Sequence, residues 1–65
     1  MNKCDIVEGQ VYVRSTFGPA KRVHHISDGY VYWEYVGEGA PTGIQNTRVE
    51  DFAAWADRRQ EMLLG

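Results

Sequence analysis

The sequence is poor in cysteine: Cys4 is the only one among 65 residues. A disulfide within one chain is therefore excluded, and a chain that folds without disulfides is typical of a reducing compartment, so we predict a cytoplasmic location. No apolar run approaches the ~20 residues that a membrane-spanning helix needs. The first residues are polar and lack the apolar core of a signal peptide, so we expect no membrane partner.

The sequence also lacks a dominant charge. Seven basic and nine acidic residues give a net charge of −2, which argues against strong non-specific binding of nucleic acid. The charges are unevenly distributed, because Arg14, Lys21 and Arg22 precede a region from Glu34 onward that is mainly acidic. We therefore expect a mildly basic N-terminal half and an acidic C-terminal half.

The chain is too short for more than one domain, which we place at residues 1–65. A chain of this size buries only about 60% of the surface that its unfolded form exposes. Domains this small usually need disulfides, a metal or a partner subunit for support. With disulfides excluded and no metal cluster in the sequence, a homo-oligomer is one possible source of stability.

The order of apolar and polar residues predicts an antiparallel sheet over about residues 6–46. Strands are expected at 6–14, 21–27 and 29–36, with a short fourth strand at 43–46. In the first strand Val11 and Val13 are expected to point inward, which places Tyr12 outward. Val23 and Ile26 are three residues apart, so both reach the core only through a bulge or a bend. Residues 27–29 predict a tight hairpin.

A helix is expected at about residues 48–63. Thr47 and Glu50 fit a capping box, with Thr47 as the N-cap. Phe52, Ala56 and Leu63 contribute to an apolar stripe at helical spacing. The predicted fold class is α+β: a small, SH3-like, strongly bent antiparallel sheet of three to four strands packed against one C-terminal helix. The helix either covers one sheet face or closes the end of a curled barrel, and we favour the barrel.

No residue pattern predicts catalysis, a cofactor or a small-molecule substrate. His24 and His25 are adjacent, and neighbours on a strand point to opposite faces, so we predict no shared metal ion. One of these imidazoles is expected to be exposed and the other partly buried. Cys4 lies in a polar segment without a recognisable base. The Gly-rich loop at 37–43 lacks the spacing of a phosphate-binding loop. We therefore predict that the protein is not an enzyme.

The outward side of the sheet is the predicted binding surface. Its expected members are Tyr12, Arg14, Lys21, Arg22, His24, Tyr30 and Tyr32. Tyr and Arg are typical of protein interfaces, which favours a protein partner or self-association. Aromatic and basic groups together also occur in proteins that bind single-stranded nucleic acid. A third interpretation is that stacked Tyr and Arg side chains only stabilise an exposed sheet.

Three segments carry a resemblance to a known group of proteins. They are Gly9-Gln10-Val11-Tyr12-Val13-Arg14, Val23-x-x-Ile26-x-Asp28-Gly29-x-Val31-Tyr32-Trp33 and Thr47-x-Val49-Glu50-Asp51-Phe52-x-x-Trp55. The chain resembles small uncharacterised proteins of phages and prophages, in which an SH3-like β-meander runs into a helix. The resemblance implies the fold and an accessory role on host or phage machinery, and it implies no catalytic residue.

Overall fold

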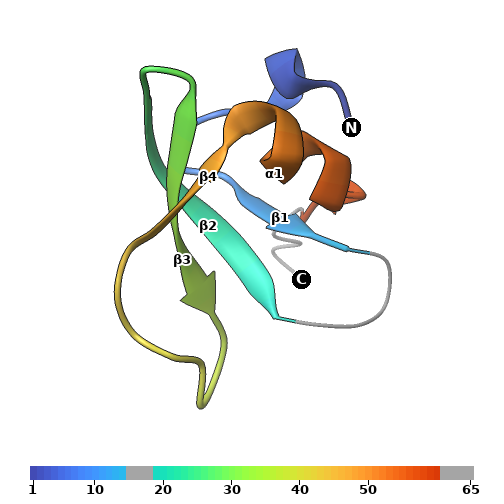
Figure 1. The fold of residues 1–65 in the computed structure, drawn as a ribbon. Coiled ribbons are helices and arrows are strands. Elements are labelled where there is room, and N and C mark those ends of the chain that lie inside the picture. The colour runs from blue at the N-terminus through green and yellow to red at the C-terminus, as the bar shows by residue number, and fades with distance from the viewer. Residues whose placement is uncertain (15–18, 61–65) are drawn as a thin grey trace.

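A curled antiparallel sheet and one short helix make up the computed structural model, which describes residues 1–14 and 19–60 (Figure 1). The elements in chain order are η1 (Lys3–Asp5), β1 (Val11–Val13), β2 (Ala20–Ser27), β3 (Tyr30–Val36), β4 (Gln45–Arg48), α1 (Val49–Trp55) and β5 (Arg58–Arg59). The predicted α+β class, with a bent antiparallel sheet and one helix, is confirmed. The sheet has five strands rather than three to four.

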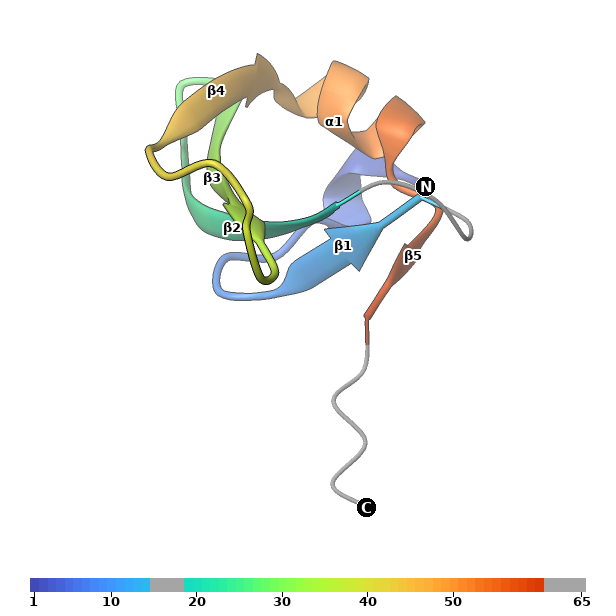
Figure 2. The same ribbon diagram turned by 90° about the horizontal axis from the view of Figure 1, so that it is seen from below.

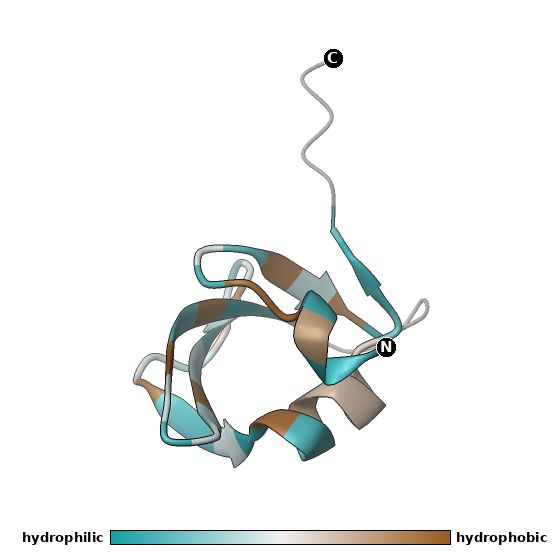
Figure 3. Ribbon diagram, turned by 90° about the horizontal axis from the view of Figure 1, so that it is seen from above, coloured by the Kyte–Doolittle hydropathy of each residue, from teal (hydrophilic) through white to brown (hydrophobic). Residues whose placement is uncertain are grey.

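The strand order is β4-β3-β2-β1-β5, and every neighbouring pair is antiparallel. Seen along its axis, the sheet curls strongly, and α1 lies across the opening next to β4 (Figure 2). Brown, apolar positions lie among teal and white ones along the sheet (Figure 3). On β3 the buried Val31 and Trp33 alternate with more exposed neighbours, as a sheet with one covered face requires. The interior therefore lies between the concave side of the sheet and the helix.

The core is formed by eight buried side chains from the sheet, α1 and the residues just after η1 and α1. They are Ile6, Tyr12, Val23, Val31, Trp33, Phe52, Ala53 and Ala56. Val31 and Trp33 lie at alternate positions of β3 and are both buried, so this side of β3 faces the core. Apolar burial of this kind is the dominant favourable contribution to folding.

A β-bulge interrupts the pairing of β2 and β3. Val23 pairs with Trp33 and Ile26 pairs with Val31, and the register shifts between Val23 and His25. The extra residue lets both Val23 and Ile26 reach the core side, as their spacing predicted. The backbone N–H of Ile26 donates to Glu8 Oε2 at 2.8 Å, so a side chain supplies an acceptor beside the bulge.

The hairpin between β2 and β3 is as tight as predicted. Asp28 and Gly29 have φ values of 53° and 78°. Glycine adopts such positive values without steric cost, and aspartate tolerates them better than most residues. The N–H of Val49 donates to the carbonyl of Gly29 at 2.9 Å. The first residue of α1 is therefore attached to the hairpin.

The prediction that Tyr12 faces outward is wrong. Tyr12 is 0% exposed, while Val11 and Val13 are only half-buried. The Tyr12 hydroxyl donates to the carbonyl of Asp5 at 2.9 Å and accepts from the N–H of Val7 at 2.8 Å. A tyrosine offers more apolar surface than a valine, and its hydroxyl costs little to bury when its hydrogen bonds are made.

The predicted helix at 48–63 is too long. α1 ends at Trp55, and Ala56 is extended, with φ −70° and ψ 127°. The chain then pairs with β1 and forms β5. Just before β5, the N–H of Asp57 donates to the carbonyl of Val13 at 2.9 Å. This pairing gives hydrogen-bond partners to N–H and C=O groups on the edge of β1. A helix continued by two turns would leave those groups unpaired. Leu63 of the expected stripe lies outside the described residues. Within the described residues, no helix is long and apolar enough to cross a membrane.

The capping box is also wrong. Thr47 lies in β4, and its hydroxyl accepts a hydrogen bond from Trp33 Nε1 at 3.0 Å. The N-cap of α1 is Arg48, whose side chain makes no capping hydrogen bond. A buried indole N–H needs an acceptor, and Thr47 faces the interior opposite Val31, where it supplies one.

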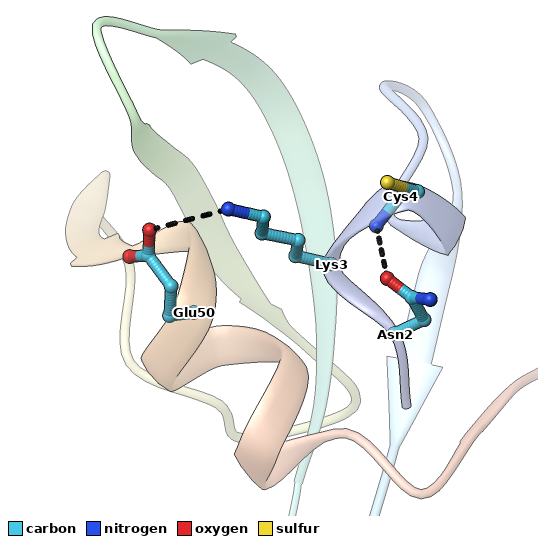
Figure 4. A network of polar contacts seen from close by, with 4 residues as sticks. All are labelled: Asn2, Lys3, Cys4 and Glu50. Carbon is cyan, nitrogen blue, oxygen red and sulfur yellow. Dashed lines mark hydrogen bonds and ion pairs between the residues drawn. The ribbon is translucent and has the colours of Figure 1, made fainter.

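The N-terminal turn contacts the start of α1 through one ion pair. Lys3 Nζ lies 3.8 Å from Glu50 Oε1 (Figure 4), with both side chains more than half exposed. Asn2 Oδ1 accepts the N–H of Cys4 at 3.0 Å and so caps η1. Glu50, expected to serve a capping box, instead contacts η1. Exposed pairs of this kind contribute little to stability.

Candidate functional site

The convex side of β2, β3 and β4, here called the outer face, collects the exposed aromatic and basic side chains. Cross-strand partners share a face, and Val23, Val31 and Trp33 mark the core side. The intervening register positions therefore define the outer face. Its members are Arg22, His24, His25, Tyr30, Tyr32, Glu34, Asn46 and Arg48.

The first row of the outer face lies beside the hairpin. Ser27, Tyr30 and Arg48 are register partners on β2, β3 and β4. The Arg48 guanidinium carbon lies 5.8 Å from the centroid of the Tyr30 ring, within the range of a cation–π contact. Tyr30 is 37% exposed, which makes it one of the few large apolar side chains open to solvent.

The second row stacks a histidine on a tyrosine. His25 is the register partner of Tyr32, which pairs on its other side with Asn46. The His25 and Tyr32 rings are nearly parallel, with centroids 4.4 Å apart and an interplanar angle of 11°. This stacking holds both rings in one orientation on the sheet surface.

The bulge brings His24 and His25 together, contrary to the prediction that they point apart. Their Nδ1 atoms are 2.8 Å apart, and both side chains are exposed rather than one being partly buried. The alternation rule fails because a bulge places two consecutive residues opposite a single partner. The contact requires one ring to donate and the other to accept. Within residues 1–14 and 19–60, no group of three metal-ligating side chains includes this pair.

The third row contains the one acidic member of the outer face. Arg22 pairs with Glu34 across β2 and β3, and Arg22 Nη1 lies 3.5 Å from Glu34 Oε1. Both side chains are well exposed, so the pair contributes little to stability. It partly neutralises Arg22. The two ion pairs recorded among the described residues do not involve Arg48.

Four of the predicted surface residues come together: Arg22, His24, Tyr30 and Tyr32 share the outer face. Three do not. Tyr12 is buried, Lys21 points to the core side opposite Tyr12 and Tyr35, and Arg14 is exposed beyond the end of β1. Tyr12 and Lys21 thus occupy core-side positions on their strands.

Four members of the outer face are absent from the predicted surface: His25, Glu34, Asn46 and Arg48. His25 was assigned to the opposite face from His24, although the Val23/Ile26 spacing already indicated the bulge that unites them. The predicted helix begins at Arg48, because the capping-box pattern begins at Thr47, whereas Arg48 is the last residue of β4. A fourth strand extended by two residues would have placed Arg48 beside Tyr30.

Lys21 lies among aromatic rings on the core side. Its Nζ is 4.2 Å from the Trp33 centroid, 4.1 Å from the Trp55 centroid and 6.0 Å from the Tyr35 centroid. Burial lowers the pKa of Lys21 below its ordinary value of 10.5, because desolvation penalises the charged form. The ammonium group thus lies against ring faces and is partly shielded from water.

The Lys21 side chain is expected to titrate at a lower pH in the folded protein than in the unfolded chain. With a pKa lowered by folding, the free energy of unfolding rises with pH between the lowered value and 10.5. Proton shifts of the Lys21 ε-methylene, followed with pH in buffer and in urea, measure both midpoints. A folded midpoint at or above the unfolded one would contradict the burial of this ammonium group.

No family model, curated protein or solved structure matches the chain. The outer face is therefore interpreted from its geometry and chemistry alone. Its rings are ordered by cross-strand stacking, and its cations outnumber its single carboxylate. Aromatic rings and arginines gathered on one face are typical of surfaces that contact another protein.

Proposed function

We propose that the protein is a non-enzymatic interaction module whose outer face binds a protein partner that presents carboxylate groups. The observation that supports this proposal is the gathering of two arginines, two histidines and two tyrosines around one acid on a single side of the sheet. Tyr and Arg are the side chains most enriched among energetically dominant interface residues. Their stacking contacts reduce the conformational freedom that binding has to remove.

Charge complementarity favours an acidic partner. Arg48 contacts the Tyr30 ring, and neither ion pair among the described residues involves it. Glu34 offsets only Arg22. A partner's carboxylates would therefore meet at least one uncompensated guanidinium, which binds carboxylates through two parallel hydrogen bonds.

Self-association through the same face is less well supported. A symmetric dimer places one surface patch against its own copy. Arg22 and Arg48 of the two molecules would then approach each other, and like charges at an interface disfavour docking.

Nucleic acid is the second candidate that this surface could bind. Base binding needs free ring faces, but His25 covers one face of Tyr32 and Arg48 lies over Tyr30. A base that stacks on the same ring face would have to displace these contacts. We therefore favour the protein partner.

We also propose that the fold belongs to the SH3-like class. Five short antiparallel strands, a bulge in β2 and a helix across the opening of the curled sheet support it. The phage-type origin stays a prediction that genomic neighbourhood would test.

Calorimetry with an acidic probe tests the proposed function. A blocked hexaglutamate peptide is expected to bind at low salt, and a hexaglutamine peptide is the neutral control. The double variant Arg22→Ala/Arg48→Ala should bind the acidic peptide about tenfold more weakly, since two surface cations are lost. The double variant Arg14→Ala/Arg59→Ala removes the same charge away from the outer face and should bind as the parent does.

Three outcomes would overturn the proposal. Equal loss of affinity in the two double variants would mean that net charge alone attracts the peptide. Tighter binding of an oligothymidylate than of the acidic peptide would favour the nucleic-acid function. No binding of the acidic peptide at low salt would remove the acidic partner.

A further inference from the structure

A second cluster of aromatic side chains lies on the core side, around the ammonium group of Lys21. Two indole rings approach the Lys21 Nζ almost equally closely, at 4.2 Å for Trp33 and 4.1 Å for Trp55. Tyr35 adds a third ring at 6.0 Å, and its plane is nearly perpendicular to that of Trp33, at 86°. Rings that surround a cation in this way form an aromatic cage, here defined as Trp33, Tyr35 and Trp55.

The walls of the cage are held in place from behind. Trp33 is 5% exposed, and its Nε1–H donates to Thr47 Oγ1 at 3.0 Å. Phe52 in the core packs against Trp55, with ring centroids 5.4 Å apart. The cage therefore does not depend on Lys21 for its shape. Tyr35 and Trp55 are half-buried, so part of the cage wall reaches solvent.

Lys21 is a poor match for the cage that it occupies. A primary ammonium group is strongly hydrated and carries three N–H donors. The two recorded ion pairs among the described residues do not include Lys21. Its lowered pKa reflects the same loss of hydration. A methylated ammonium group has fewer N–H donors or none, so it loses less on entering a cage of ring faces.

We propose that Trp33, Tyr35 and Trp55 form a binding site for an alkylammonium group, and that Lys21 occupies this site in the free protein. Lysine has a long flexible side chain that reaches solvent by rotation about its own bonds. An incoming alkylammonium ligand replaces the Lys21 ammonium between the rings. Lys21 then acts as an internal competitor, and the apparent affinity falls in proportion to the fraction of empty cage.

Intrinsic fluorescence reports on this site, because the chain has two tryptophans and both line the cage. The parent protein and Lys21→Ala are titrated with tetramethylammonium chloride, with sodium chloride at equal ionic strength as the control. A saturable fluorescence change is expected in Lys21→Ala, with an affinity about tenfold or more above that of the parent. Trp55→Ala in the Lys21→Ala background is expected to lose the saturable change.

The role of charge is tested with a matched pair of ligands. Choline is expected to bind Lys21→Ala, whereas its neutral analogue 3,3-dimethylbutan-1-ol is not, because cation–π attraction needs the positive charge. Free trimethyllysine and choline are compared in the same assay. A preference for trimethyllysine indicates a modified protein side chain as the source of the group, and a preference for choline indicates a small molecule or a lipid headgroup.

A readout on the parent protein keeps the test independent of any variant. The rings should shift the Lys21 ε-methylene protons upfield in the free protein, and tetramethylammonium should move them toward the positions of Lys3. Lys21→Ser serves as a second variant if Lys21→Ala does not fold. The proposal is overturned if a folded Lys21 variant shows no saturable change, if the neutral analogue binds as well as choline, or if the Lys21 resonances of the parent do not move.

Discussion

Replacing Phe52 with alanine is expected to lower the free energy of unfolding by about 3–5 kcal/mol. Phe52 is 1% exposed and contacts Tyr12 edge-on, with ring centroids 5.8 Å apart. It also packs against Trp33 and Trp55. Its removal opens a cavity where the helix meets the sheet, and this small domain has few other side chains to fill it. Urea unfolding followed by circular dichroism measures the change.

An exposed residue on the same helix is the control for Phe52→Ala. Asp51→Ala is expected to change the free energy of unfolding by no more than about 1 kcal/mol, since Asp51 is exposed. A domain of 65 residues has a total stability of roughly 3–10 kcal/mol. Phe52→Ala should therefore lose between about a third and all of the stability of the parent. A variant with the urea midpoint of the parent would show that α1 does not close the core.

Tyr12→Ala is expected to destabilise the protein by about 3–5 kcal/mol, because a fully buried aromatic ring is lost. Tyr12→Phe separates the hydroxyl from the ring. It leaves the N–H of Val7 without its acceptor and the carbonyl of Asp5 without its donor. We expect a cost of about 1–3 kcal/mol for this variant. Thermal and urea unfolding of both variants give the two contributions.

Tyr32→Phe is the matched control for Tyr12→Phe. Tyr32 lies on the outer face, and loss of its hydroxyl is expected to change stability by no more than about 0.5 kcal/mol. If Tyr12→Phe were as mild as Tyr32→Phe, the assignment of Tyr12 to the interior would be wrong. The two tyrosines thus test which side of each strand is covered.

Part of the fold was predictable because the local signals were strong. Aromatic and β-branched residues at alternate positions defined both faces of β3. Val23 and Ile26 are three residues apart, and only a bulge or bend reconciles that spacing with one shared face. Asp28 and Gly29 specified the hairpin through the backbone conformation that they tolerate. Each of these signals acts within a few residues of the chain.

The errors concern choices that depend on distant partners. Tyr12 and Val11 both suit a strand, and only the backbone groups of Asp5 and Val7 make the interior favourable for the Tyr12 hydroxyl. The end of α1 depends on the open edge of β1, which pairs with residues after Ala56. A helical pattern in the sequence contains no record of that edge.

The site was predictable to the same extent. Tyr30 and Tyr32 followed from the alternation of β3, and Arg22 and His24 from that of β2. The contact between His24 and His25 was harder to predict. It follows only if the bulge is known to turn two consecutive side chains to the same face. The sequence does not predict the cage around Lys21. Lysine is rarely buried, so a lysine in a strand is expected to face solvent.

An amide chemical-shift map with the hexaglutamate peptide tests the outer face most directly. We expect the acidic peptide to bind this face and not the helix side. We expect the largest shifts at residues of β2, β3 and β4 around His25, Tyr30 and Arg48, with α1 and η1 nearly unchanged. Shifts concentrated on α1 and η1, or spread evenly over the chain, would contradict it.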